Sequence, residues 1–337
     1  MRTMKRLILT TGDSSAGALK VAGLADCVID IGWRFVWGKL RSPAELDRWL
    51  SSRSATADDP DFHWLGHRNE KVIEEANLRD LGLVDFCECF EAVELWIDPE
   101  PNAQLILVWL LDFLRPHARI IRRIRLVQAD VNIGEYTSEM LMAWGPAAIP
   151  IGATHLETAS AAWQAWRAPT PQTWFGLLAR DLSVLPKLSR SVIELLEELP
   201  DLASGLGATE MRMLEILPEL GQARPFDLFP GEGKRNTRRV FEYWEVGALL
   251  DDLTADPAPA ITGIEEAPFT LEMHNDADRH TRYRQSRLSL TALGKAVLSG
   301  ADDFSRHNPI DRWWGGTELT NDRLWRWDPA NRTLIDP

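Results

Sequence analysis

The feature that most constrains the fold of this chain is a regular alternation of short apolar segments with helical patterns over residues 5–128. Apolar runs of strand length occur at 5–11, 27–31, 93–97 and 124–128, and helical patterns occur at 18–24, 43–51, 69–81 and 102–114. Ser42 and Pro43 form a typical helix start, and Pro116 stops the last helix. Strands that alternate with helices pair in parallel, since each helix returns the chain to the same edge of the sheet. The sequence therefore predicts an α/β domain over residues 1–150, with three layers and a mostly parallel sheet.

The pattern changes after Pro150, where only helices are predicted, at 156–167, 173–181 and 189–199. We expect these helices to form a connector over residues 151–204. From Gly205 the chain predicts a helix at 208–217, a long helix at 237–253, a proline-rich stretch at 256–268 and a strand that turns into a helix at 287–298. Helix, helix, β-wing and helix is the winged-helix order, so we expect a winged-helix-like α+β domain over 205–320.

The C-terminal tail, residues 321–337, has no periodicity but continues a cluster of tryptophans that begins at Trp313 and Trp314 and ends with Trp325 and Trp327. Exposed tryptophan clusters are unfavourable in water. We therefore expect the tail to wrap back onto the α/β domain.

Charge and composition exclude several classes of protein. The 37 basic residues are outnumbered by 50 acidic ones, which gives a net charge of −13 and excludes a general polyanion binder. Cys27, Cys87 and Cys89 are too few and unevenly spaced for a disulfide framework. The longest apolar run covers seven residues, 105–111, against the ~20 that a membrane helix needs. The run 7–9 is too short for the core of a signal peptide, so we expect a cytoplasmic protein without a membrane span.

The loop 12–17, between the first strand and its helix, is the strongest site candidate. Small residues here leave backbone N–H groups open at a helix start, which can bind a phosphate or carboxylate. Ligands of such sheets bind beyond the carboxyl ends of the strands. The alternative is that a side chain merely caps the helix, and neither dinucleotide-binding nor phosphate-loop spacing is present. The expected ligand-binding residues are Gly12, Asp13, Ser14, Ser15 and Gly17.

Three carboxylates surround the end of the third strand, namely Glu94, Asp98 and Glu100. In a parallel sheet they would face the same edge as Asp13, so we include them in the ligand site. The alternative is an acidic turn that places negative charge favourably at the start of the next helix.

Gly12-Asp13-Ser14 also resembles the nucleophile block of SGNH-type hydrolases, which makes Ser14 a candidate catalytic residue. A serine hydroxyl needs a histidine base that is oriented by an acid. The Asp-x-x-His spacing that supplies both in those hydrolases is absent from the sequence. His63 and His67 have the spacing of helical zinc ligands, but Gly66 between them disfavours a regular helix, so no metal site and no cofactor are predicted.

Two arginine clusters lie on the expected winged-helix domain, on the elements that contact DNA in such folds. However, residues 205–320 contain 13 basic and 19 acidic residues, a net charge of −6, which disfavours duplex binding. The clusters could therefore contact an acidic protein partner or another part of the same chain as well as DNA, and the net charge makes nucleic acid the less expected partner. The expected partner-binding residues are Arg235, Arg238, Arg239, Arg282, Arg284 and Arg287.

Several motifs together resemble the bacterial family that carries the domain of unknown function 1835. They are the loop 12–17, Glu94-Leu95-Trp96 with Gln104-Leu105, Leu290-Thr291 with Gly294-Lys295, Ile310-Asp311-Arg312-Trp313 with Gly315-Gly316, and Trp325-Arg326-Trp327-Asp328. The chain departs from that family's pattern at Ile8, where members often have His, at Lys39 after Gly38, where they tend to have Pro, and at Ala103, where they tend to have Asp. The resemblance implies an uncharacterised α/β protein with a winged-helix-like C-terminal region.

Taken together, these features predict a regulatory or adaptor protein rather than an enzyme. Its loop at Gly12 would bind a small anionic ligand, and its C-terminal domain would dock a protein partner. The alternatives are a hydrolase that uses Ser14 and a transcriptional regulator that binds DNA directly.

Overall fold

The computed structural model describes residues 4–56, 62–66, 71–231 and 233–337. The chain divides into two compact units. Unit 1 consists of residues Met1–Phe35, Leu40–Arg167 and Ala179–Ser191. Unit 2 consists of Val36–Lys39, Ala168–Leu178 and Val192–Pro337. We describe each unit separately.

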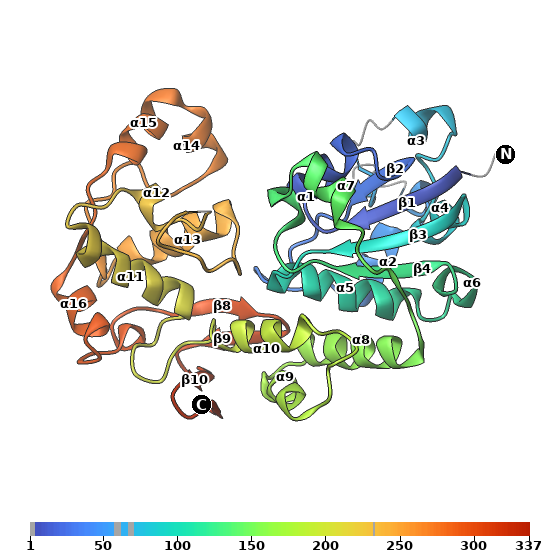
Figure 1. Cartoon of the computed structure of the whole chain (residues 1–337). Helices are drawn as coiled ribbons and strands as arrows, with labels where there is room; N and C mark the ends of the chain where they lie inside the picture. The colour runs from blue at the N-terminus through green and yellow to red at the C-terminus, as the bar shows by residue number, and fades with distance from the viewer. Residues whose placement is uncertain (1–3, 57–61, 67–70, 232) are drawn as a thin grey trace. The chain divides into compact units, whose positions relative to one another are not determined.

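A five-stranded sheet with the order β2-β1-β3-β4-β5 forms the centre of unit 1 (Figure 1). The pairs β1–β2, β1–β3 and β3–β4 are parallel, and β4–β5 is antiparallel. The mostly parallel α/β sheet that the sequence predicts is confirmed. The strands are β1 (Met4–Thr10), β2 (Cys27–Asp30), β3 (Phe90–Ile97), β4 (Ile124–Gln128) and β5 (Ile149–Pro150).

Helices of unit 1 cover the sheet on both faces, with α1 and α7 on one side and α5 on the other (Figure 1). Ile8, Val28 and Trp96 project from neighbouring strands into a core cluster with Ala16 and Leu19 of α1. The helical segments are α1 (Asp13–Val21), α2 (Pro43–Leu50), η1 (Arg53–Thr56), α3 (Lys71–Glu75), α4 (Leu83–Glu88), α5 (Pro101–Leu114), α6 (Ala118–Ile121), η2 (Ile133–Glu135) and α7 (Ser138–Trp144).

The start of α2 shows how local sequence fixes an element in unit 1. The Ser42 hydroxyl accepts from the Glu45 N–H, and the Glu45 carboxylate accepts from the Ser42 N–H at 2.9 Å. This reciprocal pair satisfies two N–H groups that a helix end otherwise leaves open. Pro43 occupies the first helical position, where its missing N–H has no cost.

Helices dominate the region in which we expect a connector. They are α8 (Ala153–Trp166), α9 (Gln172–Phe175), η3 (Gly176–Ala179) and α10 (Leu188–Leu196). The remaining helical segments of unit 2 are α11 (Ala208–Leu220), α12 (Pro225–Leu228), α13 (Tyr243–Thr254), α14 (Leu271–Asn275), α15 (Ala277–Gln285), α16 (Ala292–Leu298) and η4 (Phe304–Arg306).

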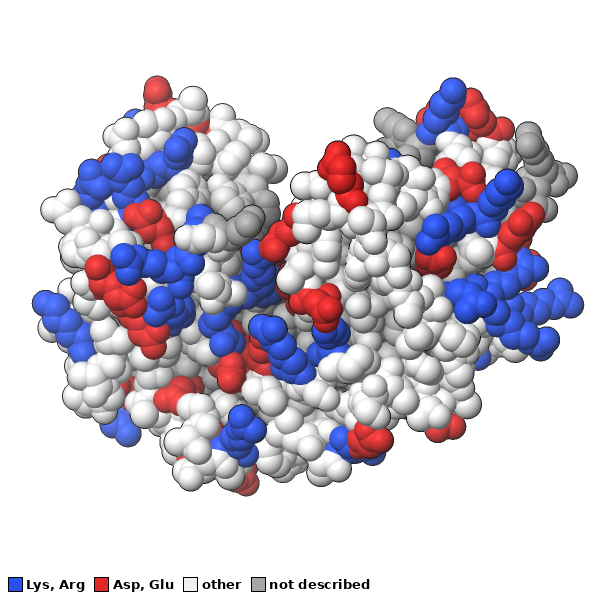
Figure 2. All heavy atoms as spheres, viewed as in Figure 1, with Lys and Arg blue, Asp and Glu red and all other residues white. Residues whose placement is uncertain are grey.

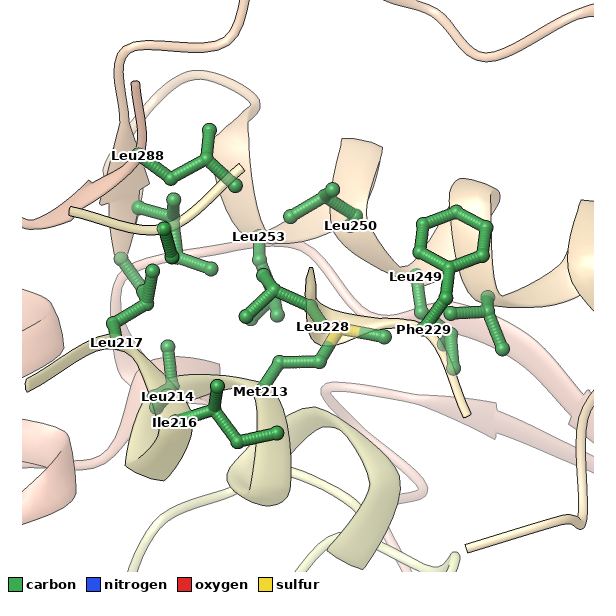
Figure 3. Close-up of a cluster of buried hydrophobic side chains, with 14 of the residues drawn as sticks. Met213, Leu214, Ile216, Leu217, Leu228, Phe229, Leu249, Leu250, Leu253 and Leu288 are labelled. Atoms are coloured by element: carbon green, nitrogen blue, oxygen red, sulfur yellow. The ribbon is translucent and has the colours of Figure 1, made fainter. Parts of the chain in front are cut away.

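Three antiparallel strand pairs complete unit 2: β6 (Ile261–Thr262) with β7 (Ser289–Leu290), β8 (Asp311–Trp314) with β9 (Thr317–Thr320), and β10 (Arg326–Asp328) with β11 (Thr333–Ile335). The core of this unit lies between α11 and α13, where leucine side chains meet (Figure 3). Leu214 and Leu217 come from α11, and Leu249, Leu250 and Leu253 come from α13.

The segment expected to form a β-wing differs from the expectation. Only two residues from each side pair, Ile261 with Leu290 and Thr262 with Ser289. The chain between β6 and β7 forms α14 and α15, because Thr270 and Asp276 cap successive helix starts by accepting from backbone N–H groups. The expected long helix at 237–253 begins only at Tyr243.

The tail tryptophans are buried by segments of unit 2, where we expected the α/β domain to bury them. Trp314 donates from its ring N–H to the Leu195 carbonyl at 2.7 Å and packs edge-on against Trp174. The Trp327 ring lies edge-on to Phe175. Across the described residues, no helix has the length and apolar character required to cross a membrane.

Candidate functional site

The loop after β1 is shorter than the sequence suggests. Gly12 precedes α1 with extended backbone (φ −157°, ψ 148°), and no side chain caps the helix. Gly17 therefore lies inside α1 on its exposed surface, and Ser15 and Ala16 are buried beneath it. Of the expected loop 12–17, Gly12 and the first-turn residues Asp13 and Ser14 follow β1 and are not buried, whereas Ser15 is buried and donates to Asp98.

Asp98 links this loop to the end of β3. Its carboxylate accepts hydrogen bonds from the Ser15 hydroxyl at 2.8 Å, the Thr11 hydroxyl at 3.4 Å and the Ile133 N–H at 2.7 Å. The side chain is only 3% exposed. Burial raises the pKa of the Asp98 carboxyl, and the three hydrogen bonds partly oppose this rise because they stabilise the ionised form.

A network of amides extends from Asp98 along the same edge. Gln104 of α5 donates to the Asp98 carbonyl at 2.8 Å, and Gln128 at the end of β4 donates to the Gln104 side chain at 3.0 Å. Asn132 donates to Glu100 at 3.1 Å. Asp98 and Glu100 thus lie beyond the end of β3, the strand that pairs in parallel with β1. Gln128 and Asn132 join this network, and neither had a signal in the sequence.

Gly134 allows the close approach of η2 to α1. A Cβ atom at this position would lie 2.8 Å from the Ser14 side chain and 2.9 Å from the Asn132 side chain. A larger residue would therefore push η2 away from the start of α1. The site edge is shaped as much by this glycine as by Gly12.

Glu94 does not belong to this group. It lies in the middle of β3, paired in register with Ile8. Its carboxylate accepts from the Arg6 guanidinium at 2.7 Å and from the Trp96 ring N–H at 2.7 Å. Glu94 thus lies three residues before the end of β3, and the structure does not bring it together with Asp98 and Glu100.

Two further polar side chains end the neighbouring strands. Thr10 closes β1 and pairs in register with Asp30, the last residue of β2. Both residues are buried, with exposures of 1% and 5%. The Thr10 hydroxyl is buried and has no hydrogen-bond partner. The end of β1 therefore carries a polar atom that is not satisfied within the described part of the chain.

The structure provides Ser14 with no base among the described histidines of unit 1. His63 accepts from the Leu65 N–H, His155 accepts from the Gly152 N–H, and the His117 ring packs on Phe113. Each of these contacts is with a residue other than Ser14. The contacts of these three histidines therefore do not support the hypothesis that Ser14 is a catalytic nucleophile.

The other nucleophilic and metal-binding candidates are also buried or lie outside the described part. Burial lowers the pKa of His63, which favours the neutral ring, and His67 lies outside the described residues. Cys27, Cys87 and Cys89 are buried and not disulfide-bonded, and burial raises the pKa of Cys87. Within the described ranges no group of three or more His, Cys, Asp or Glu side chains could hold a metal ion.

A broad cavity of about 1080 Å³ in unit 1 had no signal in the sequence. Residues of α2, α5 and α8 line it, among them Asp47, Asp112 and Trp163. Burial raises the pKa of Asp47, and the nearby Asp112 carboxylate adds to that rise. These acids come from segments about 65 residues apart, which only the folded chain brings together.

Three of the six expected partner-binding arginines form ion pairs within unit 2. Arg238 donates to Glu198 at 2.7 Å and to Glu197 at 2.9 Å. Arg235 pairs with Glu219 at 2.8 Å, and Arg282 pairs with Glu266 at 2.7 Å.

Arg282 and Arg284 lie on helix α15, where we expected a β-wing, and Arg287 follows that helix. Arg284 and Arg287 are exposed. On the face drawn in Figure 2, blue and red side chains are intermixed over unit 2, at the left of the view. Neighbouring acids therefore neutralise much of the arginine charge.

Comparison with known proteins gives no further indication. No protein-family model matches the chain, and no curated protein matches it.

Proposed function

We propose that this protein is a regulatory or adaptor protein that binds a small ligand with an anionic group at the carboxyl edge of its sheet, beside Gly12. The observation that carries the proposal is the strand order. In the sheet, β1 lies between β2 and β3. The chain runs from β1 to β2 on one side and then crosses over to β3 on the other side of β1. Open α/β sheets bind ligands at such a reversal of strand order, because the loops diverge there and leave a crevice.

The chemistry of this edge favours an anionic group that approaches α1 directly. The first-turn N–H groups of α1 have no side-chain cap, and the helix dipole favours negative charge at this end. Asp98 is the competing anion, since it already accepts from Ser15. Its raised pKa means that protonation removes this competition, so ligand affinity should increase as the pH falls.

Two matched alanine substitutions test the ligand site. A Cβ at Gly12 would be 3.9 Å from its nearest neighbours, and one at Gly17 would meet no heavy atom within 4 Å. Both variants should therefore fold, but only Gly12→Ala narrows the approach to α1. Thermal-shift titration with nucleotides and phosphorylated metabolites should give a hit that Gly12→Ala and Asp13→Ala alter and Gly17→Ala leaves unchanged. The absence of a hit, or equal responses from all variants, would remove the ligand from the proposal.

The adaptor role rests on unit 2, which we propose to be a winged-helix-like module that docks a protein partner. The order α11, α13, β6–β7 and α16 supports this, although α14 and α15 replace a simple wing. The internal pairing of Arg235, Arg238 and Arg282 disfavours duplex binding. Fluorescence anisotropy with labelled genomic fragments should show no salt-sensitive binding. Binding that weakens in Arg284→Gln or Arg287→Gln would instead support the DNA alternative.

The hydrolase alternative has a direct test of its own. Turnover of p-nitrophenyl acetate that is lost in Ser14→Ala and kept in Ser15→Ala would favour it. We expect turnover to be unaffected by Ser14→Ala, since no described histidine of unit 1 contacts that residue. The motif resemblance likewise leads us to propose a relationship with the family that carries the domain of unknown function 1835.

A further inference from the structure

A second cavity lies within unit 2 and has a volume of about 250 Å³. It brings together two motifs that the sequence analysis noted separately, the segment around Gly38 and the run Asp311-Arg312-Trp313. Val36–Lys39 belongs to unit 2 although its neighbours on both sides along the chain belong to unit 1. The cavity is therefore formed by chain segments more than 270 residues apart.

Aromatic rings form part of the wall of this cavity. Trp37 lies edge-on to Phe241 with ring centroids 5.7 Å apart, and it remains 37% exposed. Trp313 is partly buried, and the Lys39 ammonium lies 5.1 Å from the centre of its ring. An ammonium over an indole face is attracted by the negative charge of the π system. The Trp313 ring thus already binds one cation from its own chain.

Acidic groups dominate the charged lining. Glu198, Glu210, Asp252 and Asp311 line the cavity, and Arg312 is the single basic residue in its described lining. Arg312 forms a two-pronged pair with Glu210 at 2.9 and 3.0 Å and lies 4.0 Å from Asp252. The Glu198 carboxylate is held by Arg238.

Asp252 is only weakly paired. Its side chain is 58% exposed, and its contact with Arg312 is at the limit of an ion pair. Partial burial and the Glu210 charge both raise the pKa of Asp252. The Arg312 charge lowers this pKa, but only partly offsets the rise. A positive group placed in the cavity would relieve this repulsion.

We propose that this cavity binds a small organic cation, with its ammonium or guanidinium group between the tryptophan faces and the Asp252 carboxylate. Aromatic faces together with a carboxylate attract organic cations by cation–π and Coulomb interactions at once. Asp252 and the exposed Asp311 would repel an anion, and a neutral ligand would gain nothing from their charge. This site is independent of the edge beside Gly12 and does not rest on the function proposed there.

Choline is a suitable probe, and 3,3-dimethylbutan-1-ol, which has the same shape without the charge, is the control. Isothermal titration of the full-length protein should show saturable binding of choline, putrescine or tyramine, and none of the neutral alcohol. Asp252→Asn should weaken binding about tenfold, as should Trp37→Leu. Lys39→Met should strengthen it, because the internal ammonium no longer competes for Trp313.

Matched substitutions away from the cavity complete the experiment. Asp322→Asn and Trp244→Leu alter an exposed acid and an exposed tryptophan of unit 2 that do not line the cavity, and neither should change affinity. Unfolding midpoints identify any variant that is not folded. If Asp252→Asn and Trp37→Leu do not fold, Lys39→Met still tests the proposal through its expected gain of affinity. No binding by any of the three cations, equal binding of the alcohol, or weaker binding in Lys39→Met would each overturn the proposal.

Discussion

The same substitution, glycine to alanine, should have opposite effects on stability at two helical positions. Gly17 lies in α1 and Gly294 in α16, and neither has a positive φ. In a helix, alanine is favoured over glycine by about 1 kcal/mol, because glycine loses more backbone entropy on folding. At Gly17 the added Cβ meets no heavy atom within 4 Å. Gly17→Ala should therefore raise the free energy of unfolding by about 0.5–1 kcal/mol.

At Gly294 the added Cβ would lie 2.0 Å from the Ala260 carbonyl oxygen, far inside van der Waals contact. That oxygen also accepts from the Thr291 N–H at 3.0 Å and the Thr291 hydroxyl at 3.2 Å, so it cannot move without loss of these bonds. Overpacking of this kind costs about 1–3 kcal/mol or more, which outweighs the gain in helix propensity. Gly294→Ala should thus lower the free energy of unfolding by about 1–2 kcal/mol.

Urea denaturation followed by far-UV circular dichroism measures both changes as shifts in midpoint at constant slope. Tryptophan fluorescence provides a second probe and tests whether the two units unfold together. A Gly294→Ala variant as stable as the parent protein would refute the close approach of α16 to residue 260. A destabilised Gly17→Ala variant would show that Gly17 does not lie at an open helical position.

Two further predictions concern buried charges in unit 2. Burial raises the pKa of Asp251 to about 6, above its value in the unfolded chain. The folded state therefore binds more protons than the unfolded state between about pH 4 and 6. The free energy of unfolding should fall as the pH rises through this window. This fall is at most about 3 kcal/mol, and less after solvent screening, and Asp251→Asn should abolish it. If the variant kept the pH dependence of the parent protein in urea denaturation, Asp251 would not be the group responsible. Arg238→Met leaves Glu198 buried without its cation and should cost about 3–5 kcal/mol, whereas Arg282→Met breaks an exposed pair and should cost less than about 1 kcal/mol. Equal midpoints for these two variants would disprove the structural role of Arg238.

The sheet could be predicted from the sequence because its strands are short apolar runs with clear turn signals between them. The strand β4 has the same bounds as its predicted run, and α2 begins at Pro43 because Ser42 and Glu45 form a local capping pair. Local signals of this kind act within a few residues, so a single sequence displays them. The start of α1 was predicted too late, because a glycine such as Gly17 is typical of a loop. In the structure, Ala16 and Leu19 are buried on α1, and Gly17 lies within that helix.

The candidate sites could be predicted only in part, because their members are brought together by long-range pairing. Asp98 was expected at the edge from its place after β3, but its bond to the Ile133 N–H links residues 35 positions apart. The helices α14 and α15 between β6 and β7 were not predicted, because at five and nine residues they are too short to show a clear helical pattern of apolar residues. The arginines look free in the sequence, and Arg238 is neutralised by Glu198, 40 residues away.

The chain passes between the two units five times, after Phe35, Lys39, Arg167, Leu178 and Ser191. During synthesis, Val36–Lys39 leaves the ribosome about 150 residues before Val192, where the main body of unit 2 begins. Trp37 must therefore remain without its unit 2 contacts while the segments of unit 1 that precede and follow it in the sequence are synthesised and can fold. A fragment that starts at residue 205 would lack Trp37 and Trp174, and cleavage of one connecting bond would not release either unit as a complete body. Each unit thus has its own core, but neither is a single continuous segment that could be expressed alone.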